Sequence, residues 1–167
     1  MKPIVGIIMG SDSDVEVMQE AGNILKQFDI PYEMGVYSAH RSPHRTADYV
    51  KSARERGLKL IIAGAGASAH LAGVTAAETT LPVIGVPIGS SPLSGFDALL
   101  STVQMPPGVP VATMGVGKSG ATNAGIFAVQ VLALEDNKLM QRLMDYKNNL
   151  EKSVAEKSKK VQERNAE

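Results

Sequence analysis

The stretch Pro3-Ile4-Val5-Gly6-Ile7-Ile8-Met9 decides the fold, together with the turn that follows it, Gly10-Ser11-Asp12-Ser13-Asp14. A short continuous apolar run of this kind is typical of a strand buried on both faces, as in a parallel sheet covered by helices on both sides. After the polar turn, apolar residues recur at helical spacing over positions 15–28. The order is therefore strand, polar turn, helix.

The same order repeats along the chain. We expect further strands over residues 32–37, 58–63, 82–87 and 110–116, separated by helical patterns and turns. The strand over residues 32–37, the second in chain order, is the most polar of the five, which favours a place near an edge of the sheet. The pattern predicts an α/β protein with a three-layer αβα, doubly wound parallel sheet of about five strands, and the flavodoxin-like order 2-1-3-4-5 is the simplest candidate.

Composition narrows the class of protein. A chain of 167 residues is expected to form a single domain, 1–167. Its 17 basic and 17 acidic residues balance, so we expect no nucleic-acid or membrane partner attracted by net charge. There is no cysteine, which excludes disulfides and thiolate chemistry within this sequence. We expect a soluble, cytoplasmic protein.

The last third of the chain indicates self-association. Residues 122–134 are apolar nearly all round a helix. Residues 136–167 read as one long helix with a narrow apolar seam, which consists of Leu139, Leu143, Tyr146, Leu150 and Val154. One small domain rarely covers such surfaces. We therefore expect an α/β core over 1–136 and a C-terminal helix over 137–167 that packs on a neighbouring subunit.

Three turns should converge at the switch point of the predicted sheet: Gly10–Asp14, Ser38–Arg41 and Gly64–Leu71. His40 suits proton transfer near neutral pH. Arg41, with Ser11 and Ser13 at a helix start, suits a phosphate. Asp14 would repel a phosphate. A ribose diol, which can donate hydrogen bonds to the carboxylate, is its more natural partner. Together these groups predict a nucleotide-like ligand.

Each motif also has a simpler interpretation. Ser11, Ser13 and Asp14 can merely cap a helix, and the small residues around His70 can merely make a tight turn. Gly117-Lys118-Ser119 resembles part of a Walker motif, but the upstream glycine that the motif requires is missing, which argues against ATP binding.

Five motifs in order resemble the PurE family, the N5-carboxyaminoimidazole ribonucleotide mutases of purine synthesis. They are Gly10–Asp14, Ser38-Ala39-His40-Arg41-Ser42-Pro43, Ala69-His70-Leu71, Leu93–Ser101 and Val103-Gln104-Met105-Pro106. The resemblance implies an isomerase that moves a carboxylate from the exocyclic nitrogen to the adjacent ring carbon, with no metal, ATP or organic cofactor. It also implies an octamer with a flavodoxin-like core.

The resemblance assigns roles by position. His40 matches the general acid/base. The substrate-binding positions that it implies are Ser11, Ser13, Asp14, Ser38, Ala39, Arg41, Gly66, Ala67, His70 and Leu71. The loop Gly89–Gly95 would cover the site. Ala72 and Val74 depart from the proline and methionine that the family often has, which leaves pocket shape open.

Two other functions remain as alternatives. The related class that carboxylates aminoimidazole ribonucleotide directly typically has Ser-Ala-His-Lys and lacks the second histidine, whereas this chain has Arg41 and His70. A non-catalytic flavodoxin-like nucleotide-binding module is the alternative of another class. The 4% aromatic content speaks against flavin binding.

Overall fold

The computed structural model describes residues 2–165 and contains a five-stranded, fully parallel sheet. The strands are β1 (Val5–Met9), β2 (Tyr32–Val36), β3 (Leu60–Gly66), β4 (Val83–Ile88) and β5 (Ala112–Thr113). They pair in the order β2-β1-β3-β4-β5. The flavodoxin-like order predicted from the sequence is therefore confirmed.

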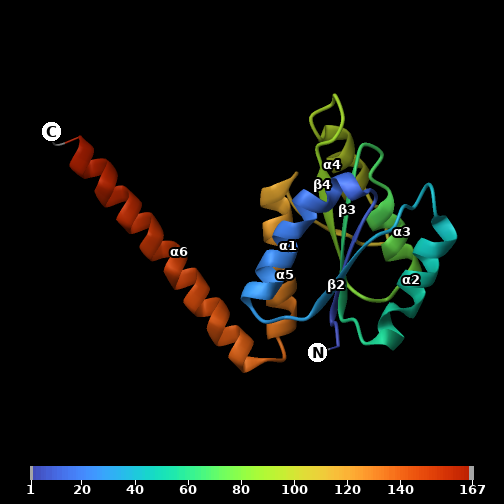
Figure 1. The fold of residues 1–167 in the computed structure, drawn as a ribbon, viewed down its shortest axis with the longest axis horizontal. Coiled ribbons are helices and arrows are strands. Elements are labelled where there is room, and N and C mark those ends of the chain that lie inside the picture. Colours follow the sequence, from blue (N-terminus) through green and yellow to red (C-terminus); the bar gives the residue numbers. More distant parts are fainter. Residues whose placement is uncertain (1, 166–167) are drawn as a thin grey trace. The chain divides into compact units, whose positions relative to one another are not determined.

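Helices cover both faces of this sheet. The helical elements are η1 (Asp12–Asp14, a 3-10 turn), α1 (Val15–Gln27), α2 (Pro43–Arg56), α3 (Leu71–Glu78), α4 (Phe96–Val103), α5 (Lys118–Ala133) and α6 (Asn137–Arg164). Figure 1 shows α1 and α5 on one side of the strands and α2 and α3 on the other. The three-layer arrangement follows from the alternation of apolar runs and helical patterns along the chain.

The inner strands form the centre of the core. Every residue of β1 and β4 is buried, as are the first five of β3, whereas β2 is only half-buried along its length. This explains why the inner strands read as continuous apolar runs and the edge strand as a more polar one. On α1 the predicted stripe is buried from Met18 onward, but Val15 at the first position stays 40% exposed.

The fifth strand is shorter than predicted. Residues 110–116 were expected to be extended, but regular pairing covers only Ala112–Thr113. Beyond it the Met114 amide still donates to the Gly85 carbonyl at 2.9 Å, so the chain follows β4 irregularly. The start of α5 lies close to this segment: a Cβ added to Gly120 would lie 1.6 Å from the Gly115 carbonyl oxygen.

The Gly-Lys-Ser segment is the start of α5, which begins at Lys118 and therefore earlier than the predicted position 122. Gly117 precedes it in the left-handed region, with φ +76°. The Lys118 ammonium pairs with the Glu16 carboxylate on α1. Lys118 therefore forms an ion pair between α5 and α1.

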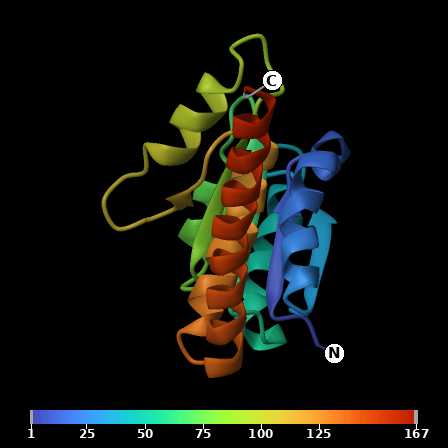
Figure 2. The same cartoon turned by 90° about the vertical axis from the view of Figure 1, so that its left-hand side faces the viewer.

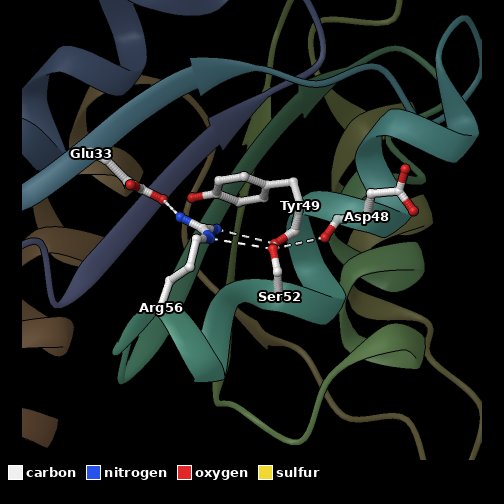
Figure 3. A network of polar contacts seen from close by, with 5 residues as sticks. All are labelled: Glu33, Asp48, Tyr49, Ser52 and Arg56. Carbon is white, nitrogen blue, oxygen red and sulfur yellow. Dashed lines mark hydrogen bonds and ion pairs between the residues drawn. The ribbon is translucent and has the colours of Figure 1, made fainter.

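A polar cluster fixes α2 against the edge strand (Figure 3). Arg56 near the end of α2 pairs with Glu33 on β2, and its guanidinium lies 4.4 Å from the centre of the Tyr49 ring. The Tyr49 ring in turn stacks on Tyr37 at 4.2 Å, and burial raises the pKa of its hydroxyl. Ser52 on α2 completes the cluster by accepting from Arg56 Nε at 3.3 Å.

The chain divides into two compact units between Ala128 and Val129, inside α5. The second unit contains the end of α5 and the whole of α6. Asp136 caps α6 by accepting from the amides of Lys138 and Leu139 at 2.9 and 3.0 Å. Of the predicted seam, Leu139 and Leu143 are buried, but Leu150 and Val154 are 51% and 66% exposed. No helix within residues 2–165 is long and apolar enough to span a membrane.

Candidate active site

A pocket of about 300 Å³ opens where the chain leaves the carboxyl ends of β1, β2, β3 and β4. In Figures 1 and 2, η1 and the loop before α4 lie at this same end of the sheet. The pocket is lined by Gly10, Ser11, Ser13, Asp14, Ser38, Ala39, His40, Arg41, Ala65, Gly66, Ser68, His70, Leu71 and Ser90. The parallel sheet thus brings together turns that are far apart in the sequence.

The turn after β1 supplies two hydroxyls and a carboxyl. The Ser11 amide donates to Asp14 Oδ2 at 3.1 Å, and the Ser13 amide donates to Ser11 Oγ at 3.4 Å, which together make a capping box. The Ser13 hydroxyl donates to Ser11 Oγ at 3.0 Å. Ser11, Ser13 and Asp14 therefore do cap the helix start, as the simpler interpretation predicts. The same three residues also line the pocket.

Asp14 is the buried acid of the site, with only 4% of its surface exposed. Burial raises its pKa above the ordinary value of an aspartate, although the hydrogen bond from the Ser11 amide and the charge of Arg41 act in the opposite direction. A carboxyl in this position gains from any ligand group that donates hydrogen bonds to it. It opposes a second negative charge.

Arg41 connects two of the three turns. Its Nη2 donates to the Gly10 carbonyl at 3.0 Å, and its backbone amide donates to Ser38 Oγ at 3.1 Å. The Ser38 carbonyl in turn accepts from the Thr46 hydroxyl on α2 at 3.2 Å. The guanidinium is thereby held over the start of η1, where backbone amides and the serine hydroxyls already favour an anion.

Two histidines meet across the pocket. His40 Nε2 and His70 Nδ1 are 2.8 Å apart, and the rings lie edge to face at 90° with their centres separated by 5.0 Å. One ring nitrogen must donate and the other accept, so each imidazole restricts the tautomer of the other. Both side chains are exposed to the open pocket. The pair can therefore give a proton to a ligand and take one back.

The turn after β3 forms another wall of the pocket. Gly66 ends β3 and brings bare backbone to the pocket, and a Cβ there would lie 1.9 Å from Ser90 Oγ. Ala67 follows in the left-handed region at φ +51°. Leu71, only 2% exposed, then begins α3. Small side chains keep this wall open to a close-fitting ligand.

Residues 4–153 match the family model described as AIR carboxylase. The chain belongs to the AIR carboxylase family. It is 56% identical over 158 residues to the N5-carboxyaminoimidazole ribonucleotide mutase of Bacillus subtilis, covering 95% of this chain and 98% of that protein. It is 51% identical over 162 residues to the mutase of Pyrococcus horikoshii, covering 97% and 90%.

The chain is also similar to a fungal carboxylase and to a solved PurE structure. The chain is 51% identical over 161 residues to the phosphoribosylaminoimidazole carboxylase of Candida albicans, covering 96% of this chain but 28% of that protein. The crystal structure of Treponema denticola PurE superposes with a TM-score of 0.84 at 27% identity, covering 92% of this chain and 95% of that one.

Most of the residues assigned from the family resemblance lie together in the pocket. The exception is Ala67, which is not part of the lining. The lining also includes Gly10, Ala65, Ser68 and Ser90, which the assignment had left out. Ala65 and Ser68 belong to the small-residue stretch after β3, and Ser90 to the loop expected to cover the site, so the signal for all three was present in the sequence.

The donors of this pocket suit a polar organic anion better than a metal ion. Over residues 2–165, no three or more His, Asp or Glu side chains are grouped so that they could hold a metal. Serine hydroxyls, one guanidinium, two imidazoles and the Asp14 carboxyl belong to the residues that line the cavity. These groups recognise phosphate and sugar oxygens.

Proposed function

We propose that this member of the AIR carboxylase family is an N5-carboxyaminoimidazole ribonucleotide mutase, an isomerase of purine synthesis. It moves the carboxylate of its substrate from the exocyclic amine nitrogen to the adjacent ring carbon, which gives 4-carboxy-5-aminoimidazole ribonucleotide. The observation that carries the proposal is the His40–His70 pair, 2.8 Å apart, in one pocket with Arg41 and the hydroxyls of Ser11 and Ser13. The high identity to two named mutases supports it.

In this proposal the ribose phosphate lies at the start of η1. Arg41 and the hydroxyls of Ser11 and Ser13 contact the phosphate, and the ribose hydroxyls donate to Asp14. This placement fits the electrostatics, because burial already disfavours the ionised Asp14 carboxyl and a donor would compensate it. The other substrate-binding residues predicted from the family resemblance surround the base; they are Ser38, Ala39, Gly66, His70 and Leu71. Ala67 shapes the turn behind them.

His40 is then the general acid and base. Breaking the nitrogen–carboxylate bond releases CO2 and leaves an amine nitrogen that takes up a proton. The ring carbon forms the new bond to the retained CO2 and afterwards loses its own proton. His40 can supply the first proton and accept the second, with His70 hydrogen-bonded to it throughout. The two transfers balance, so the reaction needs no other reactant.

Retention of CO2 is the main physical demand of this route. The released molecule must stay beside the nucleophilic carbon, since proximity replaces a bimolecular capture from solution. The bare wall at Gly66 gives it a close fit. The loop 89–95 contributes Ser90 to the pocket and can cover it against water.

We further propose a cytoplasmic homo-oligomer, an octamer, with residues 1–136 as the core and the helix over 137–167 packed on a neighbouring subunit. The exposed Leu150 and Val154 in the second half of α6 support this, because a neighbour would cover them.

The deciding experiment supplies each substrate separately to the purified protein. Formation of 4-carboxy-5-aminoimidazole ribonucleotide from the N5-carboxy compound without added bicarbonate supports the mutase. Turnover of aminoimidazole ribonucleotide with CO2, but not of the N5-carboxy compound, would establish the direct carboxylase instead, an alternative suggested by the name of the Candida albicans relative. Binding of the nucleotide with turnover of neither would indicate a binding module.

A further inference from the structure

The turn that carries His70 is fastened by a residue outside the pocket. The Ala69 amide belongs to a residue that is only 1% exposed, so its N–H needs a partner within the protein. It donates to Ser101 Oγ on α4 at 3.0 Å, across a separation of 32 positions in the chain. Ser101 itself is not among the residues that line the pocket.

The Ser101 hydroxyl is oriented for this task. It donates to the Asp97 carbonyl, four residues earlier in α4, at 2.6 Å. A hydroxyl has one proton and two acceptor lone pairs, so a proton committed to Asp97 leaves a lone pair for the Ala69 amide. A longer approach of 3.5 Å to the Ala67 carbonyl places the same oxygen against the other side of the turn.

The turn has reason to need such support. Ala67 holds a left-handed conformation, φ +51°, which is unfavourable for a residue with a Cβ and persists only where its surroundings enforce it. Three positions later, His70 must present Nδ1 to His40 Nε2 at 2.8 Å. A small rotation of the turn would separate the two rings.

We propose that Ser101 is a positioning residue of the active site, whose hydroxyl holds the turn 67–70 so that His70 meets His40. Its hydroxyl bonds to the backbone of the turn and not to either imidazole. The same helix also interacts with the loop before it, because the Ser91 side chain lowers the pKa of the Asp97 carboxyl. Helix α4 thus joins the turn behind His70 to the loop that would cover the pocket. The catalytic part of this inference rests on the proposed function.

Three variants test the proposal. Ser101→Ala removes the acceptor, and Ser101→Thr retains a hydroxyl that can make the same two bonds. Ser52→Ala is the matched control, because Ser52 lies inside α2 and its hydroxyl donates to the carbonyl four residues earlier, that of Asp48, at 2.9 Å. It also accepts one hydrogen bond, from Arg56 Nε at 3.3 Å, but it lines no part of the pocket. Comparison with Ser52 separates loss of the link to the turn from loss of a local helix bond.

The first measurement is the nitrogen NMR spectrum of the imidazoles in the ligand-free protein. The chain has three histidines, and His44 on α2 serves as an internal reference. In Ser101→Ala we expect the His40 and His70 ring-nitrogen signals to shift while those of His44 stay in place. Ser101→Thr should restore the wild-type signals, and Ser52→Ala should leave all three unchanged.

The second measurement is kcat and KM in the isomerisation assay. We expect kcat/KM to fall roughly tenfold in Ser101→Ala, the effect of one lost hydrogen bond at a buried donor, with part of the loss in kcat. Ser101→Thr should recover most of it.

Unchanged His40 and His70 signals in Ser101→Ala would overturn the proposal. So would equal losses of activity in Ser101→Ala and Ser52→Ala, because the effect would then be one of general stability. Because the NMR measurement needs no substrate, shifted signals would uphold the positioning role even if the wild-type protein failed the mutase assay. In that case only the proposed function would fall.

Discussion

Gly66 offers the sharpest steric test of the pocket. It is the last residue of β3 and pairs with Ile88 on β4. A Cβ at this position would lie 1.9 Å from Ser90 Oγ and 3.0 Å from the Ile88 carbonyl oxygen. Contacts under 3.0 Å are essentially never seen for a real Cβ, so Gly66→Ala must displace something.

The two contacts differ in how easily they yield. Ser90 is exposed, so its hydroxyl can turn away. The Ile88 carbonyl belongs to the paired backbone of β4 and can move only by distorting the ladder. Overpacking of this kind costs about 1–3 kcal/mol. For a chain of this size each kcal/mol lowers Tm by about 2–4 °C, so Gly66→Ala should lower Tm by roughly 2–12 °C.

Activity should suffer more than stability. The new methyl and the displaced Ser90 both lie at the pocket wall, so we expect KM for the N5-carboxy substrate to rise at least about tenfold, as a loss of about 1.4 kcal/mol in binding. Thermal unfolding at fixed protein concentration and steady-state kinetics measure the two effects on the same preparation.

Two further variants sharpen the test. Gly10→Ala is the stability control, because its added Cβ would meet Ala65 Cβ at 3.7 Å and Asp14 Oδ2 at 3.8 Å, which are ordinary contacts. Ser90→Gly, alone and combined with Gly66→Ala, completes a double-mutant cycle in which removal of the serine side chain should recover part of the loss. If Gly66→Ala matched Gly10→Ala in Tm and kept a wild-type KM, the close approach of Gly66 to Ser90 and Ile88 would be refuted.

Three other outcomes are expected. His40→Asn should lower kcat by about 10²–10⁴ while substrate affinity by calorimetry changes little, and wild-type turnover would exclude His40 as the acid/base. Since burial raises the pKa of Asp14, the folded protein binds more protons than the unfolded one; its contribution to stability is full below the unfolded pKa and lost as pH rises through the folded pKa. Asp14→Asn should therefore gain unfolding free energy relative to wild type as pH rises above the ordinary pKa of an aspartate, measured by denaturant titration, whereas substrate binding weakens; a constant difference would contradict the assignment of that pKa shift. Removal of the residues after Asp136 should reduce the sedimentation coefficient to that of a smaller assembly, and an unchanged profile would count against the helix packing on a neighbour.

Local sequence patterns were sufficient for most of the fold. The apolar run of β1 and its Gly-Ser-Asp turn already predict a buried parallel strand and a helix start, and the polar character of β2 predicts its place at the edge. These properties depend on the periodicity of neighbouring residues and on burial of whole strands, which a sequence expresses directly. The convergence of the His40 and His70 turns followed from strand order alone.

Contacts between distant backbone segments could not be read in the same way. Regular pairing of β5 covers only Ala112–Thr113, and just beyond it Gly120 closely approaches the Gly115 carbonyl; no local pattern records that distance. The sequence likewise placed His40 and His70 at one edge of the sheet, but only the packed turn brings their nitrogens to 2.8 Å. The link from Ala69 to Ser101 is of the same kind, because a hydrogen bond across 32 positions depends on how α4 packs against the end of β3. The sequence by itself therefore determined which elements form and which turns meet, while the tertiary structure decided which atoms within those turns touch.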